Sequence, residues 1–198
     1  MDIDFAEKIN FYLASGEFDE AVKIAGEELQ KCKNRKFDSA LYIDFNSQAE
    51  SLAYWIENYF VEINEDTDYK VLFIQMTDFS METDTWHFDI YAYLRDGGIE
   101  NTEWLDYFDP EIENEEVYPL LGCEEEEETF EIYNILQQRN RLTDELVDAH
   151  DWAEQLVRAK AFLLASLAKK KAKEMDLEWS DAVLYVGTKD DDFRAKIS

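Results

Sequence analysis

The chain has 198 residues and carries 47 Asp and Glu against 19 Lys and Arg, which gives a formal net charge of −28. This charge repels polyanions and leaves too few cations to neutralise a run of phosphates, so the sequence excludes an ordinary nucleic-acid binder and disfavours an anionic membrane surface. Hydrophobic residues make up 46% of the chain, enough for a core that needs neither a disulfide nor a metal.

Residues 1–35 predict a helical hairpin. Apolar residues at helical spacing end at Ser15-Gly16, and a second helix is expected from about Phe18 to Lys33. The run from Leu13 to Ala21 resembles the turn between the two helices of a tetratricopeptide repeat. No second copy follows at the period of about 34 residues that such repeats have, and one unit does not bury its apolar face alone. We therefore expect an ordinary pair of helices.

Residues 36–98 predict a sheet core with one helix. Leucine, isoleucine and phenylalanine alternate with polar residues over 40–45, which is typical of a half-buried strand, and a helix is expected from there to about Ile63. The run 71–76 is apolar on both sides, as a central strand is. The alternation over 85–94 predicts its neighbour, so these two strands are expected to form a hairpin.

Residues 99–128 form an acidic connection that contains both prolines, and no Lys or Arg occurs from Asp96 to Gln138. Carboxylates stand where phosphates would on a nucleic acid, and Trp and Tyr are common interface anchors, so the interleaved pattern predicts a surface that binds a basic protein. The alternative is a solvated loop whose aromatic side chains pack on the protein's own core. The predicted contact residues are Glu103, Trp104, Asp106, Tyr107, Phe108, Asp109, Glu111, Glu113, Glu116 and Tyr118.

Helices are expected over 129–175, with Thr129 and Thr143 as their N-caps. Residues 176–198 hold a closing strand at 182–186 and a tail. This order of elements predicts a single α+β domain over residues 1–198, in which a small, mostly antiparallel sheet of about four strands packs against helices and an N-terminal helical hairpin.

Three further groups carry weaker signals. His87 and Asp89 point the same way in their strand and are able to bind a metal or shuttle a proton, unless helices cover this face. His150 lacks the Glu-x-x-His spacing of a di-iron site, so we expect a structural or solvent-exposed histidine. The run Glu124–Glu128 lacks the ligand order of an EF-hand loop and predicts a solvated helix start without a metal. The residues expected to share the face of His87 are Tyr42, Asp44, Tyr69, Tyr91, Tyr93 and Tyr185.

The compartment is predicted from what the sequence lacks. The two cysteines, Cys32 and Cys123, form no CxxC pair or disulfide framework. No segment has 18 consecutive apolar residues, and the first residues lack an apolar stretch of signal-peptide type. These features predict a reduced, cytoplasmic protein, and no motif points to a cofactor.

The function expected from these patterns is that of a non-enzymatic acidic intracellular binding protein. The most concrete form is an inhibitor or immunity-type protein that neutralises a basic partner such as a nuclease toxin. One alternative is a metal-dependent or acid–base enzyme that uses His87 and Asp89. Another is a scaffold protein that holds a peptide on the N-terminal hairpin.

Overall fold

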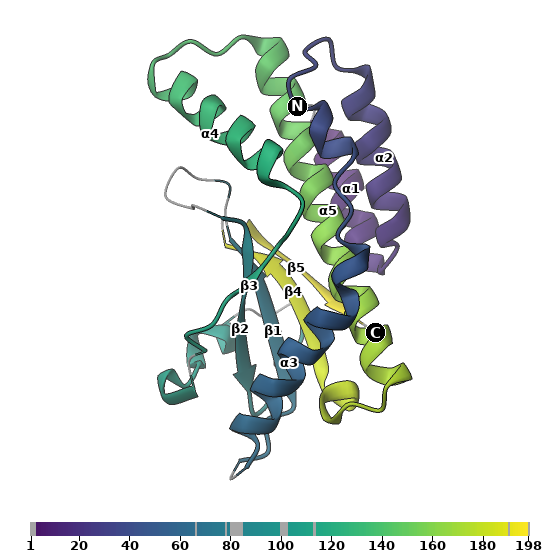
Figure 1. Cartoon of the computed structure of the whole chain (residues 1–198), viewed down its shortest axis with the longest axis vertical. Coiled ribbons are helices and arrows are strands. Elements are labelled where there is room, and N and C mark those ends of the chain that lie inside the picture. Colours follow the sequence, from purple (N-terminus) through teal and green to yellow (C-terminus); the bar gives the residue numbers. More distant parts are fainter. Residues whose placement is uncertain are drawn as a thin grey trace.

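Helices cover one face of a five-stranded β-sheet in this protein (Figure 1). The computed structural model describes residues 3–65, 67–77, 79, 85–99, 103–112, 114–189 and 191–197. The predicted α+β class is confirmed, with five strands where about four were expected. No helix in the described part of the chain has both the length and the apolar character needed to cross a membrane.

The helices pack around the longest of them. They are α1 (Ile3–Ser15), α2 (Phe18–Lys31), α3 (Ala49–Ile63), α4 (Glu124–Gln138) and the 31-residue α5 (Asp144–Glu174). Thr143 caps α5 as predicted, because its Oγ1 accepts the Leu146 N–H at 3.3 Å. The predicted N-terminal hairpin forms, with Gly16 at a positive φ of 78° between α1 and α2. In Figure 1, α2 and α4 gather around α5 at one end of the molecule, whereas α3 lies against the sheet.

The strands of the sheet are β1 (Val71–Met76), β2 (His87–Tyr93), β3 (Tyr118–Pro119), β4 (Val183–Thr188) and β5 (Asp191–Ile197), in the spatial order β3-β2-β1-β4-β5. β1 is central, as its apolar sequence predicted, and pairs antiparallel with β2 and parallel with β4. The predicted pairing of the strands over 71–76 and 85–94 is thereby confirmed. β5 forms where the sequence predicts a tail, and it pairs antiparallel with β4. Ala195 and Ile197 are buried on its inward face.

The strand predicted over 40–45 is wrong. The chain forms a 3-10 helix instead, η1 (Asp38–Leu41), and a short turn after it. The ammonium group of Lys160, on α5, donates to the carbonyl oxygens of Ala40 at 2.7 Å, Leu41 at 3.1 Å and Ile43 at 2.7 Å. Because these carbonyls accept hydrogen bonds from the half-buried Lys160, they do not need the hydrogen bonds that a neighbouring strand would provide.

The predicted cap at Thr129 is also wrong, since α4 begins at Glu124 and Thr129 lies inside it, with its hydroxyl donating to the Glu125 carbonyl at 2.9 Å. Four glutamates fill the first turn of α4, where the positive end of the helix dipole favours negative charge. The expected solvated helix start is wrong at Glu126, which is 0% exposed.

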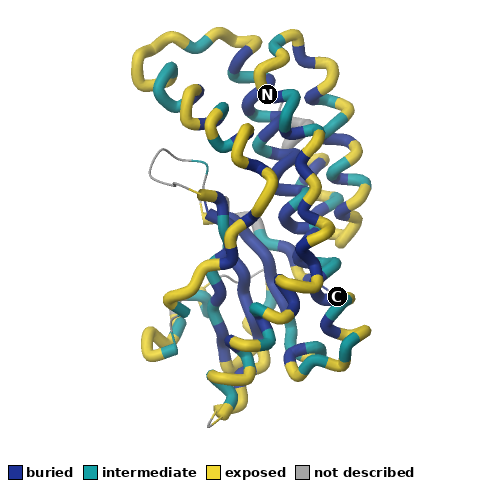
Figure 2. The backbone as a smooth tube through the Cα atoms, viewed as in Figure 1, coloured by how far each residue is buried: buried dark blue, intermediate teal, exposed yellow. Residues whose placement is uncertain are grey.

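The sheet separates two apolar clusters. The main core lies between the helices and one face of the sheet, and Figure 2 shows its buried residues following the strands and α5. A smaller cluster on the other face is built on Val71, Phe73, Tyr93 and Tyr185. Trp104 and Leu105 of the 3-10 helix η3 (Glu103–Tyr107), together with Phe108, pack against this second cluster. Part of the acidic connection therefore covers the second face of the sheet.

Candidate functional site

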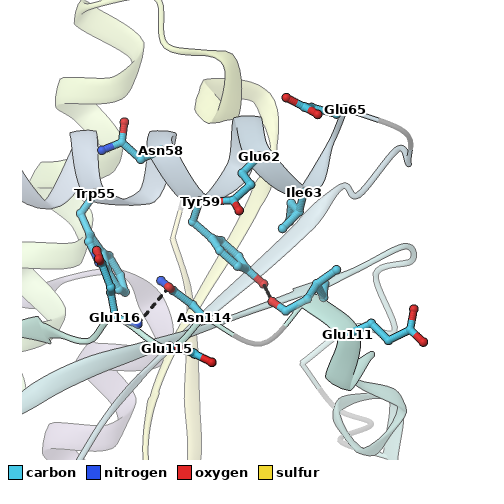
Figure 3. A pocket seen from close by; sticks show the side chains of 11 residues that line it. Trp55, Asn58, Tyr59, Glu62, Ile63, Glu65, Glu111, Asn114, Glu115 and Glu116 are labelled. Atoms are coloured by element: carbon cyan, nitrogen blue, oxygen red, sulfur yellow. Dashed lines mark hydrogen bonds between the residues drawn. The ribbon is translucent and has the colours of Figure 1, made fainter.

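A groove of about 630 Å³ lies between α3 and the chain around residues 111–116, beside the 3-10 helix η4 (Pro110–Ile112) (Figure 3). Five glutamates line it, and none of the described residues in its wall is Lys, Arg or His. We call it the acidic groove. Its lining residues are Trp55, Asn58, Tyr59, Glu62, Ile63, Glu65, Glu111, Ile112, Asn114, Glu115 and Glu116.

The aromatic part of the acidic groove comes from α3. Trp55 and Tyr59 are one helical turn apart and extend their rings toward the opposite wall (Figure 3). Tyr59 is buried, and its hydroxyl donates to the Ile112 carbonyl at 3.0 Å, which ties η4 to α3. Burial raises the pKa of the Tyr59 phenol, so the group remains a donor. The buried Nε1 of Trp55 has no hydrogen-bond partner among the described residues.

The opposite wall is held by side chains that bind nearby backbone groups. Asp109 Oδ1 accepts the Glu111 N–H at 3.0 Å, and Asn114 Oδ1 accepts the Glu116 N–H at 3.1 Å (Figure 3). The Tyr69 hydroxyl donates to the other oxygen of Asp109 at 3.5 Å, and burial together with the Asp109 charge raises the pKa of Tyr69. These contacts hold the backbone of the wall while the glutamate side chains stay exposed to solvent.

The acidic groove therefore combines negative charge with aromatic surface. Glu62 and Glu65 contribute charge from the end of α3, and Glu111, Glu115 and Glu116 contribute it from the other side. A cation that enters the groove meets carboxylates for ion pairing and aromatic faces for a cation–π contact. Methylene groups of a long cationic side chain can pack on the rings. The side chains of the acidic groove are therefore suited to contact with a cationic group.

Three of the predicted contact residues pack on the protein itself. The Trp104 indole N–H donates to the Gly98 carbonyl at 2.9 Å. The centroid of its ring lies 4.7 Å from that of Tyr93 and 5.5 Å from that of Tyr185. Phe108 belongs to the same cluster on the second face of the sheet. Tyr118 is 8% exposed, and its hydroxyl reaches the Gln48 carbonyl at 3.1 Å. For these three side chains the alternative prediction holds, in which the aromatic residues of the acidic connection pack on the protein's own core.

The other predicted contact residues whose side chains the structure describes lie at the surface. Tyr107 is 81% exposed, and Glu103 and Asp109 are exposed beside it in sequence. Among the predicted contact residues that the structure describes, only Glu111 and Glu116 line the acidic groove. The side chain of Asp106 and the whole of Glu113 lie outside the described residues.

Sequence interpretation missed the half of the acidic groove that comes from α3. A signal was present, since Trp55, Asn58, Glu62 and Glu65 recur at three- and four-residue spacing and form a mixed aromatic and acidic stripe. Trp55 fits the apolar stripe of the same helix equally well, because Leu52 and Tyr59 lie at helical spacing from it. Nothing local in the sequence indicates that this stripe faces residues 111–116, about fifty positions further along.

Gly97 offers a direct test of how Trp104 is packed. A Cβ atom added at Gly97 would lie 2.1 Å from Trp104 Cδ1, so Gly97→Ala is expected to push the indole off the sheet and destabilise the protein by about 2 kcal/mol. Urea unfolding and a red shift of tryptophan emission would report this. Gly26→Ala is the control, because its Cβ would meet only ordinary contacts at 3.8 and 3.9 Å. Equal behaviour of the two variants would contradict the packing.

The second predicted site, around His87 and Asp89, is only partly assembled. The two side chains approach each other, with His87 Nε2 3.8 Å from Asp89 Oδ1, and His87 Nδ1 lies 2.7 Å from the Thr85 carbonyl. Tyr42 and Asp44 do not join them, because no strand forms over 40–45. No group of three metal-ligating side chains occurs among the residues that the structure describes. A role for the pair stays a prediction.

His150 and the two thiols are enclosed by protein. The His150 ring stacks on the Tyr133 ring with their centroids 3.7 Å apart, and its centroid lies 4.7 Å from that of Phe130. This packing is typical of a structural histidine. Cys32 and Cys123 are both free and buried. Burial raises the pKa of the Cys32 thiol to about 12 and that of Cys123 further, so neither is a ready nucleophile.

The acidic groove is thus the arrangement of side chains in the described chain that best supports a function. Comparison of the chain with protein-family models, with curated proteins and with solved structures finds no match.

Proposed function

We propose that this protein is a non-enzymatic binding protein that holds a basic protein partner in the acidic groove. The observation that carries the proposal is that five glutamates and the aromatic residues Trp55 and Tyr59 line one groove, with no described cationic residue in its wall. A chain with a net charge of −28 also attracts a basic partner from a distance.

The groove suits an extended, basic segment of a protein. A volume of about 630 Å³ has room for several side chains, and each Lys or Arg that enters meets a carboxylate within the groove. The aliphatic stems of these side chains pack on Trp55 and Ile112, while their charged ends reach Glu62, Glu111 or Glu116. Association of this kind is fast at low ionic strength and weakens as salt screens the exposed charges.

Such binding would inhibit a partner whose own functional surface is basic. A nuclease toxin needs a basic cleft to hold its substrate, and a bulky acidic protein seated there occludes the cleft. We therefore propose an inhibitor or immunity-type protein that acts by steric occlusion in the cytoplasm. Two free, buried thiols support the proposal of a reducing compartment.

Removal of three charges from the groove tests the proposal. The variant Glu111→Gln/Glu115→Gln/Glu116→Gln is expected to bind an oligo-arginine peptide at least tenfold more weakly than the wild type in 50 mM salt, because it loses charge pairs of the kind that carry such binding. The matched control is Glu17→Gln/Glu128→Gln/Glu131→Gln, which removes three exposed charges outside the groove. Isothermal titration calorimetry gives both affinities.

The same pair of variants separates a functional groove from a uniform acidic coat. If the groove holds the peptide, the control loses less than threefold in affinity and keeps the salt dependence of the wild type. Equal losses in the two variants would show that the negative charge acts only as a diffuse field, and would contradict the proposal. Retention of a basic partner from lysate at low salt by the control and not by the groove variant would extend the result to proteins.

A further inference from the structure

A second, smaller cavity lies between η1 and the start of α4 and shares no lining residue with the acidic groove. It has a volume of about 120 Å³, which is enough for one narrow side chain. We call it the Glu126 cavity. The residues that matter in its wall are Ser39, Tyr42, Ile43, Cys123, Glu125 and Glu126.

Glu126 has a buried oxygen atom that lacks a donor. Its side chain is 0% exposed, and the Ser39 hydroxyl donates to Oε2. Oε1 has no hydrogen-bond partner among the described residues. A buried carboxylate oxygen without a donor costs free energy, because water has been removed from it and nothing replaces the lost hydrogen bonds. A ligand that brings a donor to this oxygen recovers that free energy.

The charged groups that face Glu126 leave its negative charge only partly balanced. Asp38 of η1 and Glu125 of α4 add negative charge, and the Ala40 N–H stabilises the carboxylate. Lys160 of α5 attracts the carboxylate across η1, but its three ammonium hydrogens are already directed at the carbonyls of residues 40, 41 and 43. Lys160 therefore contributes charge without a free donor.

The remaining walls of the Glu126 cavity are neutral or apolar. The Cys123 thiol donates to the Leu120 carbonyl at 3.1 Å, and burial raises its pKa, so it brings no charge. Ile43 is buried, whereas the ring of Tyr42 is 82% exposed at the surface. An aliphatic chain can lie along these two residues with its charged end directed at Glu126.

We propose that the Glu126 cavity binds a single primary ammonium group, of the kind carried by a lysine side chain. One oxygen of Glu126 is free and the other is used by Ser39, which suits a compact point charge and not the two parallel bonds of a guanidinium group. A divalent metal is a poor match, because no three metal-ligating side chains come together in the described chain. This site is independent of the proposed function of the acidic groove.

The test uses amide chemical shifts of the full-length, 15N-labelled protein at pH 8. Butylammonium and a capped lysine are expected to shift the amides of Ser39, Gly122 and Cys123 saturably, whereas a capped norleucine of similar shape leaves them unchanged. The diamine putrescine tells a free amine from a protein side chain: tighter binding of putrescine than of capped lysine points to a small-molecule amine. Absence of saturable shifts with both ammonium probes, or equal binding of a capped arginine, would overturn the proposal.

Two variants, one control variant and a change of pH show whether Glu126 is the acceptor. Glu126→Gln is expected to weaken binding at least tenfold, and Tyr42→Ala severalfold, while Glu128→Gln, an exposed glutamate of the same helix outside the cavity, is expected to change it less than twofold. Burial raises the pKa of Glu126 to about 7, so its negative charge is lost as the pH falls and binding should weaken between pH 8 and pH 6. Unchanged binding by Glu126→Gln would place the ammonium group elsewhere and contradict the assignment.

Discussion

Replacement of Lys160 by methionine is expected to destabilise the protein by about 3 kcal/mol, because it removes three hydrogen bonds from a charged donor and leaves their acceptors without partners. The acceptors are the carbonyl oxygens of residues 40, 41 and 43, which lie 2.7 to 3.1 Å from the ammonium nitrogen. Methionine retains most of the aliphatic packing of the lysine, so the loss of stability measures the contribution of the polar contacts. Urea unfolding at pH 7 measures the free energy of unfolding of both proteins.

The loss of stability caused by Lys160→Met is expected to increase with pH. Burial lowers the pKa of Lys160 from its ordinary 10.5 to about 8, so between these values the unfolded chain binds more protons than the folded protein. The contribution of Lys160 to stability therefore rises as the pH increases from 8 toward 10.5. The difference between the wild type and Lys160→Met should accordingly be larger at pH 10 than at pH 7.

Lys170→Met is the control for Lys160→Met, because Lys170 is an exposed lysine of the same helix. Lys170→Met should change the free energy of unfolding by no more than about 0.5 kcal/mol at both pH values. Hydrogen exchange should accelerate over residues 40–45 in the Lys160 variant alone. A loss below 1 kcal/mol, or one that Lys170→Met reproduces, would show that Lys160 does not hold this segment.

Glu126→Gln is expected to stabilise the protein in alkaline solution. The pKa of Glu126 lies at about 7 in the folded protein against an ordinary 4.5, and burial is the main cause. The folded state thus prefers the protonated carboxyl, and stability from this group is lost as the pH rises from 4.5 through 7. That difference corresponds to about 3 kcal/mol, so the free energy of unfolding of the variant should exceed that of the wild type by about this amount at pH 8.5 and by little at pH 4.5.

Chemical denaturation of the wild type, Glu126→Gln and Glu128→Gln at pH 4.5 and pH 8.5 measures the effect. Glu128 is exposed on the same helix, and its removal should change stability by less than 0.5 kcal/mol at either pH. Destabilisation by Glu126→Gln at pH 8.5 would contradict the burial of an ionised carboxylate at this position. The expected gain also means that a loss of ammonium binding in Glu126→Gln could not be attributed to unfolding.

Local patterns in the sequence determined much of the fold. The apolar run over 71–76 and the alternation over 85–94 are properties of consecutive residues, and β1 and β2 form where they predict. The Gly16 turn and the Thr143 cap are equally local and appear as expected. β5 carries a weaker signal of the same kind, in which Ala195 and Ile197 alternate with charged residues, but four positions are too few to tell a strand from a tail.

The net charge and its concentration in residues 96–138 follow from the sequence alone, because charge is additive along a chain. The tertiary structure decided which of these carboxylates work together. It placed Glu111 and Glu116 opposite Trp55 and Glu62 of α3, enclosed Glu126 behind η1, and turned Trp104 and Phe108 onto the sheet. In the folded protein the carbonyls of residues 40, 41 and 43 accept hydrogen bonds from Lys160, more than a hundred positions away, and no strand forms where the local alternation favours one. Contacts of this kind depend on which faces meet when the elements pack, and that is a property of the assembled core and not of any window of sequence.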